Sequence, residues 1–137
     1  AAASSKGVDP KLLEQVLHSA WDKLSEIDAV NPLFSRPVVE SFPDLATAYL
    51  AAIESPMDLS TMRAKISPGH YKSLDDFGAD AELIANNCLA FNKDDRSLCK
   101  AANAFKSKWK RALPGLRKQL ETTKKAAAAA AIPKKQA

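Results

Sequence analysis

The stretch SLDDFGADAELIANNCLAFN, from Ser73 to Asn92, decides the fold of this chain. Its serine and two aspartates are typical of a helix start, because a hydroxyl caps free N–H groups and carboxylates favour that end of the helix dipole. Apolar residues then recur at steps of four and three, which places them on one helical face: Phe77, Ala81, Ile84, Cys88 and Phe91. The stretch therefore predicts a long amphipathic helix that ends at Asn92.

Three further helices are expected around this one. Asp9 and Pro10 form a good helix start, and apolar residues at helical spacing continue to about residue 28. A short helix fits residues 58–66, before a Pro-Gly pair breaks it. Asp94 or Asp95 caps a last helix, whose inner face would hold Leu98, Ala102, Phe105, Trp109, Ala112 and Leu116. Pro114 lies within that pattern, so we expect a kink or an end there.

Residues 29–57 lack the helical period and contain four prolines. A connection of this length is unusual in a compact domain, and such segments are often functional. It is too apolar for disorder, so we expect it to pack back on the bundle, with a short turn of helix near residues 46–52. The predicted fold is all-α: a four-helix bundle with a long apolar loop between the first and second helices.

Bulk properties fit one domain of a soluble globular protein. The chain has 137 residues, of which 46% are hydrophobic and 26% charged. No apolar run reaches membrane-spanning length and no secretory signal opens the chain, so no membrane association is expected. Cys88 and Cys99 form no CxxC pair, which favours a reducing compartment. We expect a disordered leader over residues 1–8, the domain over residues 9–121, and a basic, alanine-rich tail over residues 122–137.

Charge is distributed unevenly along the chain. Residues 1–99 carry nine Lys/Arg against fifteen Asp/Glu, whereas residues 100–137 carry eleven Lys/Arg against Glu121 alone. An acidic body attracts basic partners, and a basic helix offers a weak contact for nucleic acid. The alternative for the basic helix is an ordinary solvated face.

Catalytic and metal-binding patterns are absent from the sequence. His18 and His70 fall in different elements, and neither is placed to activate a serine or cysteine. Glu14 and His18 are four residues apart, which is not the spacing of di-iron bundles, and no Cys/His cluster has zinc spacing. We therefore expect neither an enzyme nor a bound cofactor.

Two motifs stand out by their order and separation: Pro56-Met57-Asp58-Leu59 and Asn87-Cys88-x-x-Phe91-Asn92. Together they resemble the motifs of a bromodomain, over about residues 10–120 of the chain. The resemblance implies a left-handed four-helix bundle whose two inter-helix loops frame a pocket for acetyl-lysine. It also implies a non-catalytic nuclear reader of acetylated histone tails or other acetylated nuclear proteins, which we expect to be a monomer.

Site residues follow from the resemblance position by position. Asn92 would donate to the acetyl carbonyl, Tyr49 would reach it through a water, and Leu98 would be the gatekeeper. The remaining pocket residues implied are Leu33, Phe34, Pro37, Val38, Cys88 and Phe91. Leu45 offers a competing alignment for Tyr49 but lacks a hydroxyl, and Pro32-Leu33-Phe34 stands where many bromodomains have Trp-Pro-Phe.

Elementary chemistry agrees with this ligand. Acetylation removes the lysine charge, so an amide enters an apolar pocket where an ammonium would lose several kcal/mol of solvation. Acidic residues on the two loops would attract flanking basic residues: Glu40, Asp44, Glu54, Asp94 and Asp95. Three alternatives stay open: Asn92 as a left-handed helix cap, a bromodomain with an inactive pocket, and a basic nucleic-acid-binding or scaffolding module that uses the last helix.

Overall fold

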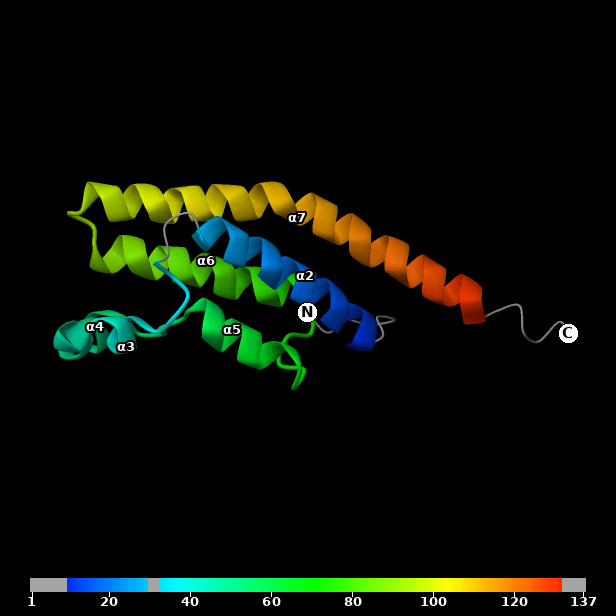
Figure 1. Cartoon of the computed structure of the whole chain (residues 1–137), viewed down its shortest axis with the longest axis horizontal. Coiled ribbons are helices and arrows are strands. Elements are labelled where there is room, and N and C mark those ends of the chain that lie inside the picture. The colour runs from blue at the N-terminus through cyan, green and yellow to red at the C-terminus, as the bar shows by residue number, and fades with distance from the viewer. Residues whose placement is uncertain (1–9, 30–32, 132–137) are drawn as a thin grey trace, which may run out of the picture.

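The computed structural model describes residues 10–29 and 33–131, which form helices and no strand. The elements are α2 (Pro10–Ala29), α3 (Val38–Ser41), the 3-10 helix η1 (Pro43–Leu45), α4 (Ala46–Ala52), α5 (Leu59–Ile66), α6 (Leu74–Phe91) and α7 (Arg96–Ala131). Figure 1 shows α2, α5, α6 and α7 as the bundle, with α3 and α4 at one end. The predicted all-α fold is confirmed. The expected leader, the Asp9 cap and the last six residues lie outside the described residues.

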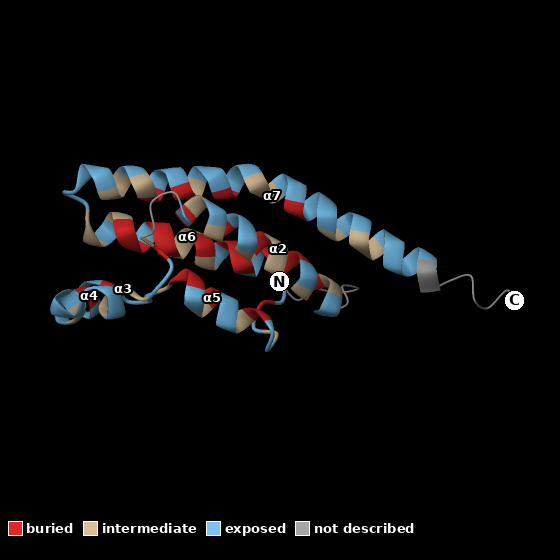
Figure 2. Cartoon of the chain, viewed as in Figure 1, coloured by how far each residue is buried: buried red, intermediate tan, exposed pale blue. Residues whose placement is uncertain are grey.

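The core lies where α7 packs against α6 and α2, and where α5 packs against α2 and α6. Figure 2 shows the buried positions of these helices facing one another. Trp109, Phe77 and Phe105 are its largest fully buried side chains. A Cβ added to Gly78 would lie 3.3 Å from the Trp109 ring, so the absence of a side chain there lets α6 approach α7 closely.

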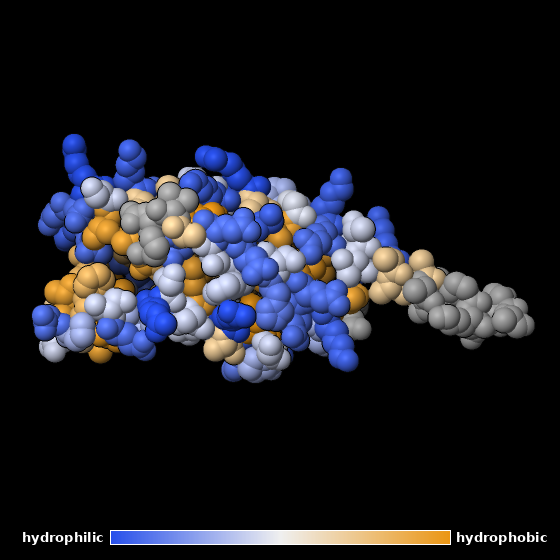
Figure 3. All heavy atoms as spheres, viewed as in Figure 1, coloured by the Kyte–Doolittle hydropathy of each residue, from blue (hydrophilic) through white to orange (hydrophobic). Residues whose placement is uncertain are grey.

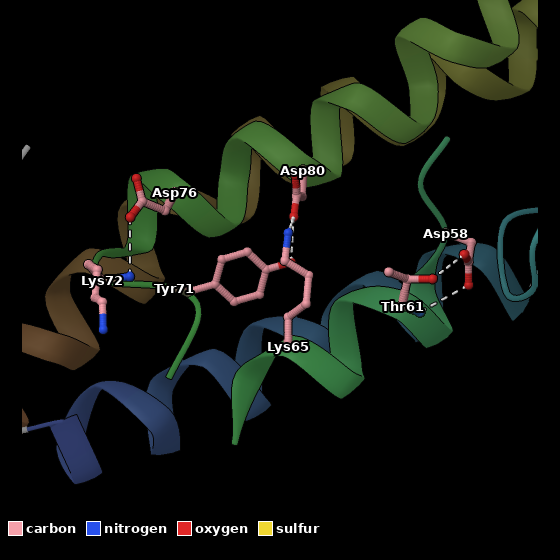
Figure 4. Close-up of polar contacts among 7 residues, drawn as sticks. All are labelled: Asp58, Thr61, Lys65, Tyr71, Lys72, Asp76 and Asp80. Carbon is pink, nitrogen blue, oxygen red and sulfur yellow. Dashed lines mark hydrogen bonds and ion pairs between the residues drawn. The ribbon is translucent and has the colours of Figure 1, made fainter. Parts of the chain in front are cut away.

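Helices α6 and α7 begin at predicted caps, and α5 begins at a cap that was not predicted. The Ser73 hydroxyl accepts a hydrogen bond from the Asp76 N–H at 3.1 Å. Asp95, rather than Asp94, caps α7, because its carboxylate accepts from the Leu98 N–H at 3.0 Å. The Asp58 carboxylate caps α5 through the Thr61 N–H at 3.0 Å, as Figure 4 shows.

Helix α7 continues through Pro114 to Ala131. The two outcomes expected at this proline were a kink or an end, and Figure 1 shows that the helix bends without ending. Proline has no N–H for the carbonyl four residues earlier, which weakens one side of the helix and bends it. Pro114 is exposed, so water can solvate that carbonyl. The helix also crosses residue 121, where we placed the domain boundary.

A half-buried polar cluster joins α5 to α6. The Asp80 carboxylate accepts from the Tyr71 hydroxyl at 2.7 Å and pairs with Lys65 at 2.5 Å (Figure 4). Burial, and then the hydrogen bond to Asp80, raise the pKa of Tyr71, so its hydroxyl remains a donor over the whole neutral range. The cluster holds the start of α6 in place.

The long connection, residues 33–58, begins at a buried carboxylate. Asp28, on the last turn of α2, accepts from the N–H groups of Leu33 and Phe34, both at 2.9 Å, and from the Ser35 hydroxyl at 2.5 Å. The side chain of Asp28 is only 3% exposed, and these donors compensate for its lost solvation. We call this arrangement the Asp28 clasp.

The far end of the long connection is tied to the bundle as well. The carbonyl of Phe34 accepts from the Leu59 N–H at 2.8 Å, and the carbonyl of Ser35 accepts from the Ser60 N–H at 3.1 Å. The Asn87 side chain on α6 donates to the Ser55 carbonyl at 2.8 Å. The expected short helix is present as α4. The two ends of the connection are therefore fixed, and its middle stands out at one end of the molecule (Figure 1).

Candidate functional site

A pocket of about 190 Å³ lies between the long connection and the junction of α6 with α7. Eight of the nine predicted site residues line it: Leu33, Phe34, Val38, Tyr49, Cys88, Phe91, Asn92 and Leu98. Pro37 does not line the pocket and instead sits at the N-cap of α3. The pocket thus brings together residues from both loops that the sequence singled out.

Asn92 occupies the C-cap of α6 with its backbone fully engaged. Its N–H donates to the Cys88 carbonyl at 2.9 Å, and its carbonyl accepts from the Asp95 N–H at 2.8 Å and the Cys99 thiol at 3.2 Å. Its φ is −111°, so it is not the left-handed cap considered above. Within the described residues, the side-chain amide makes a single weak contact, from Nδ2 to Cys88 Sγ at 3.8 Å. The backbone serves the cap, and the carboxamide is left available at the pocket.

Tyr49 reaches the same pocket from α4. It is 3% exposed, and its ring packs edge-on against Phe91 with 4.9 Å between the ring centroids. Its hydroxyl makes no hydrogen bond to residues 10–29 and 33–131, and the hydroxyl oxygen is not itself fully buried. Burial, and then the nearby Cys88 and Asp58, raise the pKa of Tyr49, so the hydroxyl stays protonated and can donate at neutral pH.

Most of the pocket lining carries no charge. Burial raises the pKa of the Cys88 thiol, although the contact from Asn92 opposes this shift, so the thiol is neutral near pH 7. Arg36 is the charged side chain in the lining, and it is exposed at the mouth. A neutral polar group of a ligand that enters the pocket would therefore meet an apolar lining, with the Asn92 amide and the Tyr49 hydroxyl as hydrogen-bonding groups.

Sequence reasoning missed five lining residues: Arg36, Phe42, Leu45, Met57 and Ile84. Two of them had usable signals, since Met57 belongs to the Pro-Met-Asp-Leu motif and Ile84 precedes Cys88 by one helical turn. Phe42 and Leu45 are 54% and 43% exposed. Figure 3 shows hydrophobic surface at the end of the molecule that α3 and α4 occupy. Phe42 and Leu45 give the pocket an apolar rim.

Other kinds of site find no support in the described part of the chain. Residues 10–29 and 33–131 contain no group of three or more His, Cys, Asp or Glu side chains that could hold a metal ion. None of the described helices is both long and apolar enough to span a bilayer.

The chain is similar to known bromodomain proteins. Bromodomain adjacent to zinc finger domain protein 2A of Mus musculus is 42% identical over 71 residues, which cover 49% of this chain and 4% of that protein. Bromodomain-containing protein 9 of Xenopus laevis is 35% identical over 108 residues, or 75% of this chain and 20% of that protein. A bromodomain-containing protein homolog of Drosophila melanogaster is 34% identical over 110 residues, or 80% and 7%.

This chain therefore spans a fifth or less of each of these relatives. The family model for the bromodomain matches residues 14–104, which include the long connection, α6 and the first part of α7. The matched range contains every residue of the pocket. The chain belongs to the bromodomain family of acetyl-lysine-binding modules.

Proposed function

We propose that the pocket binds the side chain of an acetylated lysine, with Asn92 Nδ2 donating to the acetyl carbonyl and Tyr49 reaching that oxygen through a water. One observation carries this proposal: the Asn92 side-chain amide makes no strong hydrogen bond to any described residue, although the Asn92 backbone is fully engaged. A bridging water is nearly as favourable in enthalpy as a direct hydrogen bond. The amide and the hydroxyl thus supply two donors for one carbonyl.

Discrimination against unmodified lysine would come from the apolar interior. Desolvating an ammonium costs several kcal/mol, whereas the hydrogen bond to a neutral carbonyl contributes only about 0.5–1.5 kcal/mol. None of the described residues that line the pocket has a carboxylate to compensate an ammonium, and the charged one among them, Arg36, repels it. The pocket therefore selects mainly by rejecting the charged form.

The flanking surface suits a basic peptide. Exposed carboxylates lie on both loops beside the pocket: Glu40, Asp44, Glu54, Asp94 and Asp95. Acetylated histone tails or other acetylated nuclear proteins would supply both the neutral amide and the neighbouring cations. We therefore propose that the module acts in the nucleus, as a monomer. Bromodomains are reader modules and in general non-catalytic. One side chain in one pocket predicts a Kd between about 10 μM and 1 mM.

The test is calorimetric titration of acetylated and unmodified histone peptides into wild type, Asn92→Ala and Asn86→Ala. Wild type should prefer the acetylated peptides, and Asn92→Ala should weaken their binding by about tenfold or more, because the buried carbonyl loses its partner. Asn86 is the matched control, since it is exposed on α6 and contacts Lys106 at 2.9 Å, away from the pocket. Equal binding of both peptide forms, or wild-type affinity in Asn92→Ala, would refute the proposal.

The alternative function, a basic module for nucleic acid or scaffolding, concerns the exposed side of α7. The many exposed cations of this helix favour it as an additional function. Asn92→Ala separates the two, because it would abolish peptide binding and leave a contact made through α7 intact.

A further inference from the structure

Cations recur along α7 with a regular spacing. Three adjacent basic pairs follow one another seven residues apart: Lys110-Arg111, Arg117-Lys118 and Lys124-Lys125. Seven residues are almost two helical turns, so each pair lies within about 20° of the previous one around the helix. Fifteen residues from first to last correspond to about 22 Å along the axis. We call these six residues the basic stripe.

Few carboxylates neutralise the basic stripe. Five of its members are exposed and Lys124 is half-buried. Arg117 pairs with Asp75 at 2.9 Å and Lys124 with Glu121 at 3.8 Å, both at the surface, where such pairs are weak and easily exchanged. The other four cations form no ion pair with any described residue. Glu121 is the sole acidic residue of α7.

The basic stripe is accessible because five of its six cations are exposed along α7, whose last turns also project past the other helices. Figures 1 and 2 show this part of the helix projecting past the other helices, with mostly exposed residues. Its first pair adjoins a shallow hollow at the α2–α7 contact, lined by Lys23, Lys108 and Arg111 together with Glu26. Positive charge therefore continues from the stripe onto the neighbouring helix.

We propose that the basic stripe binds the phosphate backbone of duplex DNA. Duplex DNA carries one negative charge per about 1.7 Å of axis, so a stripe of this length meets more phosphates than it has cations. Single strands are usually held by exposed aromatic side chains that stack on bases. The aromatic residues of α7, Phe105 and Trp109, are both 1% exposed and unavailable for stacking.

Such a contact would not depend on DNA sequence. Lysine and arginine side chains on phosphates set position and affinity, while sequence is read by contacts with base edges. The basic stripe consists of lysine and arginine side chains alone, so it would contact phosphates and not read base edges. It also lies away from the pocket, since Leu98 and Lys125 are 27 residues apart on one helix, or about 40 Å. The two surfaces can therefore be occupied together, and this inference does not rest on the proposed reader function.

The test measures binding of a fluorescent DNA duplex between 50 and 200 mM salt for wild type and for the double variant Lys118→Gln/Lys125→Gln. If the four unpaired cations each release one counterion, wild-type affinity should fall by about 150-fold over this range. Removing two of them should reduce that fall to about 12-fold. The control variant, Lys72→Gln/Lys93→Gln, loses the same charge at exposed positions outside the stripe and should keep the wild-type salt dependence.

Three results would overturn the assignment. They are an equal change in salt dependence in the control variant, equally tight binding of polyglutamate of matched charge, and tighter binding of single-stranded DNA or duplex RNA than of duplex DNA. The stripe variant should retain its helix content by circular dichroism, because glutamine is a good helix former. It should also bind acetylated peptide as wild type does, so failure of the stripe and failure of the pocket can be told apart.

Discussion

The two ends of this elongated molecule have opposite chemistry. At one end, the long connection and the α6–α7 junction enclose an apolar pocket that carries one amide and one phenol. Toward the other end, exposed cations of α7 form the basic stripe, and the last turns of this helix project past the bundle. In the roles we propose, the pocket holds the acetyl group by excluding charge, so this contact should depend little on salt. The stripe would act only through charge, which salt screens.

This contrast shows how one helix can serve two kinds of recognition. The first turns of α7 supply Leu98 to the pocket, the middle supplies Phe105 and Trp109 to the core, and the last turns supply cations to solvent. The first turns and the middle of α7 have apolar neighbours to pack against, whereas the last turns have none within the described chain and therefore carry charged residues. Variants that act on one end should leave the other unchanged, unless they disturb the middle.

The largest effect is expected from a variant that disturbs the middle. Gly78→Val adds atoms where a Cβ already lies 3.3 Å from the Trp109 ring, so we expect unfolding to become easier by about 1–3 kcal/mol. Thermal unfolding would measure this loss, and both binding activities should disappear together at the lower midpoint. Gly115→Val is the control, because no atom lies within 4 Å of a Cβ there. Equal midpoints for the two variants would show that the Gly78–Trp109 approach does not hold the ends together.

A smaller effect is expected when only the pocket is changed. Tyr49→Phe removes one hydroxyl and should weaken binding of acetylated peptide by about 3- to 10-fold, the value of one hydrogen bond. Tyr71→Phe is the matched control: it should lower stability, because its hydroxyl bonds Asp80 at 2.7 Å, without changing affinity. Titration and unfolding of both variants would measure the difference. If Tyr49→Phe binds acetylated peptide with wild-type affinity, the proposed water-mediated contact of Tyr49 is wrong.

The smallest effect should come from the charge at the pocket mouth. Arg36→Gln should raise the affinity for unmodified peptide by about twofold and leave acetylated peptide unchanged, since exposed charges interact weakly across solvent. Arg63→Gln serves as the control, because Arg63 lies over the Trp21 ring, 4.9 Å from its centroid, and does not line the pocket. Competition titrations at low salt would resolve the change. An equal change in affinity in both variants would show that the effect comes from the net charge of the protein and not from the position of Arg36.

Much of the fold could be predicted because its signals are local. The Ser73 cap and the four–three spacing after it lie within one segment, as do the short helix α4 and the bend at Pro114. The elements α3 and η1 are four and three residues long, too short to show a period, and were missed. Tertiary contacts decide such short elements more than propensity does.

Site residues could be predicted where they belong to a sequence motif. They could not be predicted where their role depends on how exposed they are in the folded chain. Asn92 and Tyr49 came from the resemblance, and both line one pocket, although their binding roles stay predictions. Phe42 and Leu45 were missed, because an apolar residue in a proline-rich segment gives no sign that it lies at a rim instead of in the core. The same holds for Asp28, since a carboxylate near a helix end is usually solvated.

The Asp28 clasp has a kinetic consequence. Local opening exposes the parts of a protein with the fewest buried contacts before the rest. Amides at Leu33, Phe34, Leu59 and Ser60 are held by the clasp and by the pairing beside it, whereas the middle of the long connection carries exposed Phe42, Leu45 and Leu50. The exposed amides of this middle part should therefore exchange with solvent faster than the amides of its two ends, while the buried side chains of Tyr49 and Ile53 anchor it to the bundle.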